Sequence, residues 1–276
     1  ARLVATILGP LMGKTIHHVK NSKDFVDKTK DLKLGPDEIM VSFDVSALFT
    51  NVPVDKSEEI IRGMLDKDNT LCERTPLSVD EIMKLLHHCL TTTYFVCQDN
   101  YYEQIYGAAM GSPVSPIVAN LYMEYFEQLA LSTAEHPPRV WMRYVDDTFT
   151  VMLKVYMGAF TDHINSIDEH IKFTHEVEEE GKIAFLDTES IRQDDGTIKH
   201  KVFRKATHTD QYLNFESHHI LGQKLGVVKT LFDRCDSIVT TEEDRKEEKG
   251  NLCKALKNCG PPPSPGFEGE TSPHEC

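Results

Sequence analysis

Residues 144–147 read Tyr-Val-Asp-Asp, and runs of β-branched and aromatic residues lie on either side, at 140–144 and 148–153. These runs predict two antiparallel strands, so that the two aspartates lie at the tip of a hairpin. Hairpin tips favour Asn-Gly or Asp-Gly, whereas two adjacent carboxylates repel each other. The pair therefore costs stability unless a cation neutralises it, which makes Asp146 and Asp147 candidate ligands of a divalent metal.

A third carboxylate, Asp44, follows a short buried strand predicted over residues 39–43. A lone aspartate at a strand end is usually a turn or capping residue, and that alternative stays open for Asp44. If its strand lies beside the 140–153 hairpin, the carboxylates come close, because neighbouring strands are about 4.8 Å apart. They would then hold two Mg²⁺ ions about 3.5–4 Å apart, which suits phosphoryl transfer. Hard oxygen ligands fit Mg²⁺ better than zinc.

The composition is that of a folded protein with an uneven charge distribution. The 276 residues are 40% hydrophobic, which suffices for one large domain or a core with a smaller appendage and excludes a disordered polymer. The formal net charge is −14, which is unusual for a nucleic-acid binder. Residues 199–234, however, contain seven Lys and Arg against three Asp and Glu, so this segment is the candidate contact surface for nucleic acid.

The cysteines and the hydropathy of the sequence indicate the cellular compartment in which the protein is expected. The seven cysteines form no CxxC pair and lack zinc-site spacing, which indicates thiols in a reducing, intracellular compartment. No apolar run approaches the 18 residues of a membrane helix, so we expect no membrane partner. The sequence opens without Met, and we expect a fragment of a longer protein.

The order of predicted elements favours an α+β domain with an antiparallel sheet and helices on one face. Asp55 with Glu58, and Ser78 with Glu81, have the spacing of capping boxes at two helix starts. The further elements expected are a hairpin over 91–105 turning at 99–100, a helix from Ser115–Pro116, a helix over 156–170, and strands at 183–186 and 198–203 separated by a turn at 194–196. From Pro261 onward the low-complexity sequence predicts disorder.

Three segments resemble the motifs of reverse transcriptases, in the same order along the chain. Residues 43–49, Phe-Asp-Val-Ser-Ala-Leu-Phe, resemble motif A, and residues 107–113, Gly-Ala-Ala-Met-Gly-Ser-Pro, resemble motif B. Tyr-Val-Asp-Asp at 144–147 resembles motif C. The longer strings that resemble Penelope-like retroelements lie at 49–53, 185–187 and 207–215, and the resemblance spans about residues 11–235.

The resemblance implies a right-hand polymerase with partial fingers over residues 1–38, a palm over 39–190, a thumb-like region over 191–250 and a disordered tail over 251–276. It implies a nuclear retrotransposon enzyme, an RNA-directed DNA polymerase of the nucleotidyltransferase class. Such an enzyme extends a DNA primer on an RNA template with dNTPs, using two Mg²⁺ ions or Mn²⁺ in their place. An endonuclease domain is expected in the full-length element, and no stretch here matches one.

The resemblance also assigns roles around motif A and motif C. Asp44 and Asp146 would be the metal ligands, and Asp147 a supporting carboxylate. Phe49 follows Asp44 by five residues and would be the aromatic gate that excludes a 2′-hydroxyl, with a simple core position as the alternative.

Motif B would contact the incoming nucleotide. Gly111, Ser112 and Pro113 would let the backbone approach the template base or the nucleotide closely, which a Cβ would block. Lys172 or Lys182 would protonate the departing pyrophosphate, although a solvated surface lysine is the alternative for both.

The basic surface would position primer and template through phosphate contacts without reading sequence. It comprises Lys199, Lys201, Arg204, Lys205, Lys224 and Lys229. Tyr212 and Phe215 would pack or stack beside it. An ordinary solvated charged face is the alternative.

Two other functions fit parts of the sequence. A truncated, non-catalytic nucleic-acid-binding remnant of such an element is one, because the basic finger residues upstream of motif A have no match here. A metal-dependent phosphohydrolase that uses the same aspartates is the other, and it leaves the loop at 107–116 unexplained.

Overall fold

The computed structural model describes residues 1–260, and the chain divides into two compact units. Unit 1 consists of residues 1–20 and 37–177, and unit 2, as far as the structure describes it, of residues 21–36 and 178–260. Each unit has its own antiparallel sheet and its own buried apolar core. The α+β class that the sequence predicts is therefore confirmed.

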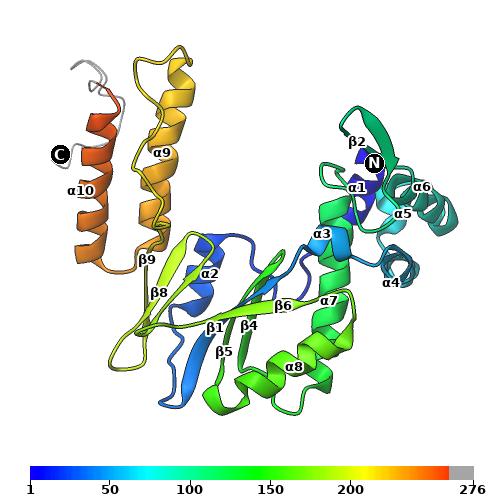
Figure 1. The fold of residues 1–276 in the computed structure, drawn as a ribbon, viewed down its shortest axis with the longest axis horizontal. Helices are drawn as coiled ribbons and strands as arrows, with labels where there is room; N and C mark the ends of the chain where they lie inside the picture. The colour runs from blue at the N-terminus through cyan, green and yellow to red at the C-terminus, as the bar shows by residue number, and fades with distance from the viewer. Residues whose placement is uncertain (261–276) are drawn as a thin grey trace. The chain divides into compact units, whose positions relative to one another are not determined.

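A four-stranded antiparallel sheet, in the order β4-β5-β1-β6, occupies the middle of unit 1 (Figure 1). Its strands are β1 (Glu38–Val45), β4 (Val140–Tyr144), β5 (Asp147–Leu153) and β6 (Phe173–Val177). The predicted 39–43 strand and 140–153 hairpin are confirmed. They are direct neighbours, because β1 pairs with β5 from Glu38 opposite Leu153 to Asp44 opposite Asp147.

Helices α7 (Ser115–Thr133) and α8 (Met157–Ile167) lie against one face of this sheet (Figure 1). Side chains alternate along β1, so that Phe43 points to this face, and it is fully buried. Its ring centroid lies 6.0 Å from that of Trp141 on β4 and 6.1 Å from that of Phe160 on α8. Strand β1 and helix α8 thus share one core.

Unit 1 has further elements besides this sheet and its two helices. They are α1 (Arg2–Leu8), the 3₁₀ helix η1 (Gly9–Leu11), α3 (Leu48–Asn51), α4 (Val54–Asp66), α5 (Leu71–Arg74), α6 (Val79–Thr91), β2 (Tyr94–Cys97), β3 (Asn100–Glu103) and η2 (Lys154–Tyr156). The capping box of α6 is confirmed, since Ser78 Oγ accepts from Glu81 N at 3.3 Å and Glu81 Oε2 accepts from Ser78 N at 2.8 Å.

The other predicted capping box is wrong. Helix α4 begins at Val54 with Pro53 as its N-cap, so Asp55 lies inside the first turn and caps nothing. Glu58 instead contacts His87 Nδ1 of α6 at 3.1 Å. The cause is that a proline in extended conformation supplies a helix start without a side-chain acceptor.

Three other boundaries shift slightly. The β2–β3 hairpin turns at Gln98 and Asp99, both with positive φ, instead of at 99–100. Helix α7 has Val114 as its N-cap, so that Ser115 is the first helical residue. Helix α8 starts and ends within the predicted 156–170 range.

Up to residue 260, unit 2 contains a three-stranded antiparallel sheet, β7-β8-β9, and three helices. The elements are α2 (Ser22–Thr29), β7 (Lys182–Phe185), β8 (Thr188–Arg192), β9 (Ile198–Val202), α9 (Leu221–Ile238) and α10 (Glu242–Asn258). Sequence patterns do not reveal β8. The turn at 194–196 joins β8 to β9, whereas Leu186, with a φ of +53°, turns the chain from β7 into β8.

The core of unit 2 joins its last two helices to the sheet. Leu231 and Cys235 of α9 pack with Leu252 of α10 and Val202 of β9. Helix α2 contacts the sheet through Phe25, whose ring centroid lies 4.6 Å from that of Phe185.

The C-terminal region differs from the expected tail. Helix α10 includes residues 251–258, which the tail was expected to contain, and the disorder predicted from Pro261 lies outside the described residues. Within residues 1–260, no helix is long and apolar enough to cross a bilayer.

Candidate active site and nucleic-acid interface

The predicted carboxylates meet at one end of the four-stranded sheet. Asp44 and Asp147 are register partners across β1 and β5. Asp146 lies in the tight turn between β4 and β5, and its carbonyl oxygen accepts a hydrogen bond from Val45 N at 3.3 Å. We call Asp44, Asp146 and Asp147 the carboxylate cluster.

The pKa of Asp44 is raised above its ordinary value. Desolvation is the largest cause although the side chain reaches solvent, and the negative charges of Asp146 and Glu176 add to it. A hydrogen bond from the Val45 N–H opposes these effects. Asp44 and Asp146 are therefore close enough to repel each other, and a divalent cation between them would relieve the repulsion.

The donor set suits a hard divalent cation that keeps part of its hydration. Within residues 1–260, no group of three or more His, Cys, Asp or Glu side chains is placed to hold a metal ion, so the three carboxylates do not form a three-ligand site. Mg²⁺ typically binds one or two carboxylates and completes its octahedron with water and substrate phosphates. The pair Asp44 and Asp146 offers that number of protein ligands.

The turn that carries Asp146 is tied to a buried ion pair. Arg143 is fully buried, and its Nη1 donates to the carbonyl oxygen of Val145 at 2.8 Å. Its Nε donates to Glu127 Oε1 of α7 at 2.8 Å. Arg143 and Glu127 lie outside the three motifs. A signal was nevertheless present, because alternation along β4 puts Arg143 on the same inward face as Trp141.

The motif B loop is fastened to the segment that follows β1. Ala108 N donates to the carbonyl oxygen of Phe49 at 2.7 Å. Gly107 has a φ of +73°, and a Cβ there would lie 2.5 Å from the carbonyl oxygen of Thr50. Only glycine allows this approach, so the loop at 107–113 and the predicted gate form one connected structure.

The predicted nucleotide contacts lie in and beside this loop. Gly111 has a φ of +93°, with open space where a Cβ would be, while Ser112 is half-buried and Pro113 exposed. Phe49 lies in α3, partly buried against the core of unit 1. Lys172 Nζ donates to two carbonyl oxygens, those of Asn165 at 2.7 Å and Asp168 at 3.2 Å, which fixes it within unit 1.

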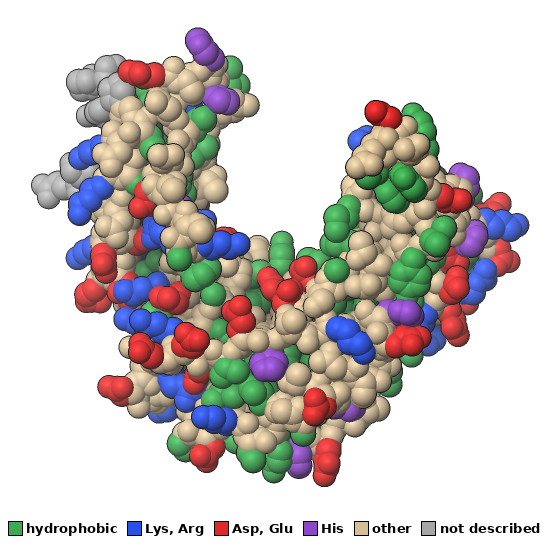
Figure 2. All heavy atoms as spheres, in the orientation of Figure 1, with side chains coloured by type: hydrophobic (Ala, Val, Ile, Leu, Met, Phe, Trp, Pro, Cys, Tyr) green, Lys and Arg blue, Asp and Glu red, His purple; other side chains and the backbone are tan. Residues whose placement is uncertain are grey.

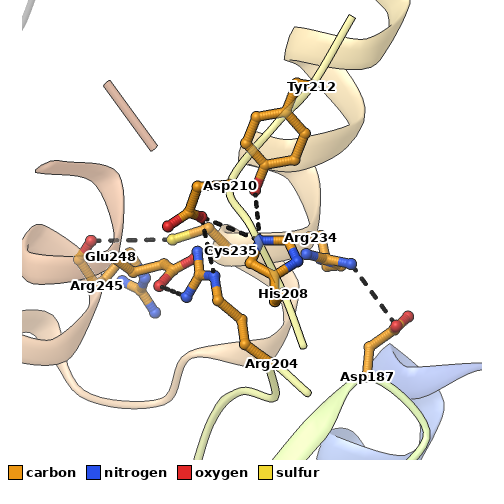
Figure 3. Close-up of polar contacts among 9 residues, drawn as sticks. All are labelled: Asp187, Arg204, His208, Asp210, Tyr212, Arg234, Cys235, Arg245 and Glu248. Carbon is orange, nitrogen blue, oxygen red and sulfur yellow. Dashed lines mark hydrogen bonds and ion pairs between the residues drawn. The ribbon is translucent and has the colours of Figure 1, made fainter. Parts of the chain in front are cut away.

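Three of the six residues of the basic surface are paired with acids inside unit 2. Lys199 and Lys201 of β9 lie 3.3 and 2.7 Å from the carboxylate oxygens of Asp244 on α10. Arg204 forms a two-bonded pair with Glu248, with N–O distances of 2.7 and 2.5 Å (Figure 3). Figure 2 likewise shows positive and negative side chains interspersed over α10.

The other three residues of the basic surface are Lys205, Lys224 and Lys229. Lys224 Nζ donates to the carbonyl oxygens of Phe215 and Ser217 at 2.5 and 2.6 Å. Among residues 1–260, neither Lys205 nor Lys229 forms an ion pair with a carboxylate. These two lysines are the part of the basic surface most accessible to a phosphate.

A pocket of about 360 Å³ lies beside Lys205 in unit 2 and is bordered by Arg234 and His208. Arg234 Nη1 lies 3.7 Å from Asp187, and His208 Nε2 lies 3.0 Å from Asp210 (Figure 3). The Tyr212 hydroxyl points to the same His208 nitrogen at 3.5 Å. Tyr212 is thus engaged within unit 2.

Solved structures with a similar fold are nucleic-acid polymerases. A telomerase of Candida albicans in complex with the TWJ fragment of telomeric RNA matches with a TM-score of 0.64 and 13% identity, over 93% of this chain and 45% of that chain. An RNA-dependent RNA polymerase of a human picobirnavirus matches with a TM-score of 0.56 and 12% identity, over 92% and 47%.

A truncated apo telomerase of Candida tropicalis gives a TM-score of 0.54 and 18% identity, over 73% of this chain and 44% of that chain. The present chain spans less than half the length of each of these structures. It has the α+β fold of the right-hand nucleic-acid polymerases, with antiparallel sheets.

Sequence comparison adds one local match. The profile of a family described as an animal helix-turn-helix domain matches residues 211–264, a range that includes α9 and α10. No curated protein sequence matches the chain.

Proposed function

We propose that this chain is the polymerase region of a reverse transcriptase from a Penelope-like retroelement. It would extend a DNA primer on an RNA template with dNTPs. The observation that carries the proposal is the register of β1 and β5, which brings Asp44 of the motif A segment next to the motif C turn. Motif B adds support, since its loop is hydrogen-bonded to Phe49 directly after motif A.

Asp44 and Asp146 would hold the metal ions, with Asp147 as a supporting carboxylate. When bound, two Mg²⁺ ions supply activation of the primer 3′-hydroxyl and stabilisation of the leaving pyrophosphate oxygen. The protein's own contribution is to keep the two carboxylates close despite their repulsion. Desolvation is the main cause of the raised pKa of Asp44, and the charge of Asp146 adds to it. That repulsion favours cation binding.

Phe49 would exclude ribonucleotides. Its backbone is fixed by the hydrogen bond from Ala108, so that a nucleotide held by Gly111, Ser112 and Pro113 would meet a ring in a defined place. Phe49→Ala should raise the ratio of rNTP to dNTP incorporation, measured on one template with each nucleotide in turn. An unchanged ratio would assign Phe49 to the core alone.

Unit 2 would contact the primer–template duplex without reading sequence. Lys205 and Lys229 are the most accessible phosphate contacts of the basic surface, while the lysines and arginine paired with α10 also order unit 2. Helices α9 and α10, which begin in the predicted thumb-like region, would lie along the duplex. This assignment rests on the polymerase fold and on the charge of residues 199–234.

Primer extension on an RNA template tests the proposal. Wild-type protein should incorporate dNTPs with Mg²⁺, and Asp146→Asn should abolish incorporation because one metal ligand loses its charge. Asp194→Asn, in the exposed turn between β8 and β9, is the matched control and should retain full activity. Salt-sensitive duplex binding without extension by the wild type would favour the non-catalytic remnant instead.

A further inference from the structure

The turn that presents Asp146 has a backbone conformation that needs support. Val145 has a φ of +56°, a left-handed conformation that a β-branched residue rarely adopts. Such conformations cost free energy and persist only where the surroundings impose them. Something in unit 1 must therefore hold Val145, and with it the direction in which Asp146 points.

Arg143 provides a direct support. Its side chain is fully buried, and its Nη1 donates to the carbonyl oxygen of Val145 at 2.8 Å. That carbonyl belongs to the peptide that leads into Asp146. The hydrogen bond therefore fixes the plane of the peptide from which the Asp146 residue continues.

The guanidinium of Arg143 is itself fixed by α7. Its Nε donates to Glu127 Oε1 at 2.8 Å, and its Nη1 also donates to Asn120 Oδ1 at 3.0 Å. The same Glu127 oxygen accepts from Trp141 Nε1 at 2.9 Å. Asn120 and Glu127 are seven residues apart, so they share one face of the helix.

The ion pair is almost fully withdrawn from water, with side-chain exposures of 0% for Arg143 and 1% for Glu127. Burying two charges is costly, and well-packed apolar residues often give equal or greater stability. Stability alone thus gives little reason for this pair in the core. The hydrogen bond to Val145 gives it a second task.

The backbone of Arg143 is anchored as well. Its N–H donates to the carbonyl oxygen of His17 at 2.8 Å, and its carbonyl accepts from Val19 N at 2.8 Å. Because hydrogen bonds hold both its main chain and its guanidinium, Arg143 can act as a rigid support for the turn.

Helix α7 connects Arg143 to the motif B loop. The helix begins at Ser115, whose Oγ donates to the carbonyl oxygen of Ala109 within the loop at 2.7 Å. Five residues further on, Asn120 contacts Arg143. One rigid element therefore joins the predicted nucleotide contact to the turn with Asp146.

We propose that Arg143 is a positioning residue that holds Val145 in its left-handed conformation and so sets Asp146 against Asp44 for cation binding. Glu127 and Asn120 orient its guanidinium. The proposal rests on the proposed polymerase function, because that function gives Asp44 and Asp146 shared cations to hold.

The test measures Mn²⁺ binding to the purified chain from the loss of the free-ion paramagnetic resonance signal. Arg143→Lys keeps the charge beside Glu127 but lacks the planar fork needed to reach the Val145 carbonyl at the same time. Its Mn²⁺ affinity should fall about 10- to 100-fold, as is usual when a partner that orients a metal ligand is lost. In primer extension, kcat should fall while KM for dNTP stays unchanged.

A rescue experiment separates positioning from general stability. Glycine adopts positive φ readily, so Val145→Gly removes the conformation's cost. The double variant Arg143→Lys, Val145→Gly should regain much of the Mn²⁺ affinity that Arg143→Lys loses. The control is Arg139→Lys. Arg139 precedes the start of β4 and forms another Arg–Glu pair, with Glu38, so losing its planar fork should leave Mn²⁺ affinity unchanged.

The outcomes are distinct. Wild-type Mn²⁺ affinity in folded Arg143→Lys, or no recovery in the double variant, would overturn the positioning role while leaving the polymerase proposal intact. A wild type that neither binds Mn²⁺ nor extends a primer would overturn the proposed function itself. If circular dichroism shows Arg143→Lys unfolded, Asn120→Ala decides, with a smaller affinity loss supporting the role and none overturning it.

Discussion

The carboxylate cluster of unit 1 and the basic surface of unit 2 differ in how their charges are balanced. Among residues 1–260, no ion pair joins Asp44 or Asp146 to a basic side chain, and the two acids repel each other. Lys199, Lys201 and Arg204 have acidic partners on α10. The unbalanced acids are where the proposed cations would bind, whereas the balanced charges of unit 2 also serve the fold.

Removing one charge from the carboxylate cluster tests the first half of this comparison and should have the largest effect. Asp44→Asn should lower the rate of primer extension by about 10³-fold or more, because metal-held charge is worth several kcal/mol in the transition state. Without metal, its free energy of unfolding should be unchanged or higher, since repulsion from Asp146 is relieved. Urea denaturation in chelator that shows strong destabilisation would contradict the account.

The second half of the comparison concerns unit 2, and the pH dependence of its stability sharpens it. Burial lowers the pKa of His200 to about 4 from 6.5, so the folded state keeps it neutral between Thr29 Oγ1 at 2.9 Å and Ser190 Oγ at 3.1 Å. As pH falls from 6.5 to 4, His200 is protonated in the unfolded chain but stays neutral in the folded chain. Stability should fall by about 3 kcal/mol across that window.

Urea denaturation at several pH values measures this loss, and His200→Gln supplies the control. The variant has no titrating ring, so its stability should change less between pH 6.5 and 4 than that of the wild type. Equal slopes for the two proteins would show that His200 titrates normally.

The contact between motif A and motif B predicts a loss of intermediate size. Gly107→Ala would place a Cβ 2.5 Å from the Thr50 carbonyl oxygen at a positive φ, and should destabilise unit 1 by about 1–3 kcal/mol. Gly158→Ala is the matched control, because Gly158 lies in α8 with nothing within 4 Å of a Cβ. It should stabilise by about 0.5–1 kcal/mol. Similar melting temperatures for both variants would contradict the predicted contact.

Freeing the paired lysines should have the smallest effect. Desolvation would raise the pKa of Asp244, but hydrogen bonds from Lys201, Thr241 and Lys199 lower it to about 2, so it is charged at neutral pH. Asp244→Asn should tighten duplex binding at low salt and steepen the dependence of log K on log salt by about 1 for each freed lysine. Titration at several salt concentrations that gives the wild-type slope would show that β9 does not face the duplex.

Local patterns predicted much of unit 1 and less of unit 2. The strand at 39–43 and the hairpin at 140–153 have clear apolar runs, and the box of Ser78 and Glu81 has a local cause. Strand β8 reads Thr-Glu-Ser-Ile-Arg, which lacks such a run, and it is a strand because β7 and β9 pair with both its edges. Pairing partners of this kind are set by tertiary structure.

The carboxylate cluster could be inferred from motif order, and its surroundings could not. The buried pair of Arg143 and Glu127 joins a strand to a helix, and neither charge stands out without the packing around it. The acids that neutralise β9 lie more than 40 residues away in the sequence, on α10. A local count of basic residues therefore overstates the charge that the surface presents.

The most direct measurement is a crystal of the chain grown with an RNA–DNA primer–template, a dNTP and Mn²⁺, with anomalous data collected at the manganese edge. Two anomalous peaks are expected about 3.5–4 Å apart between the Asp44 and Asp146 carboxylates. Density for the nucleic acid with no manganese at the carboxylate cluster, or with manganese bound elsewhere, would contradict this expectation.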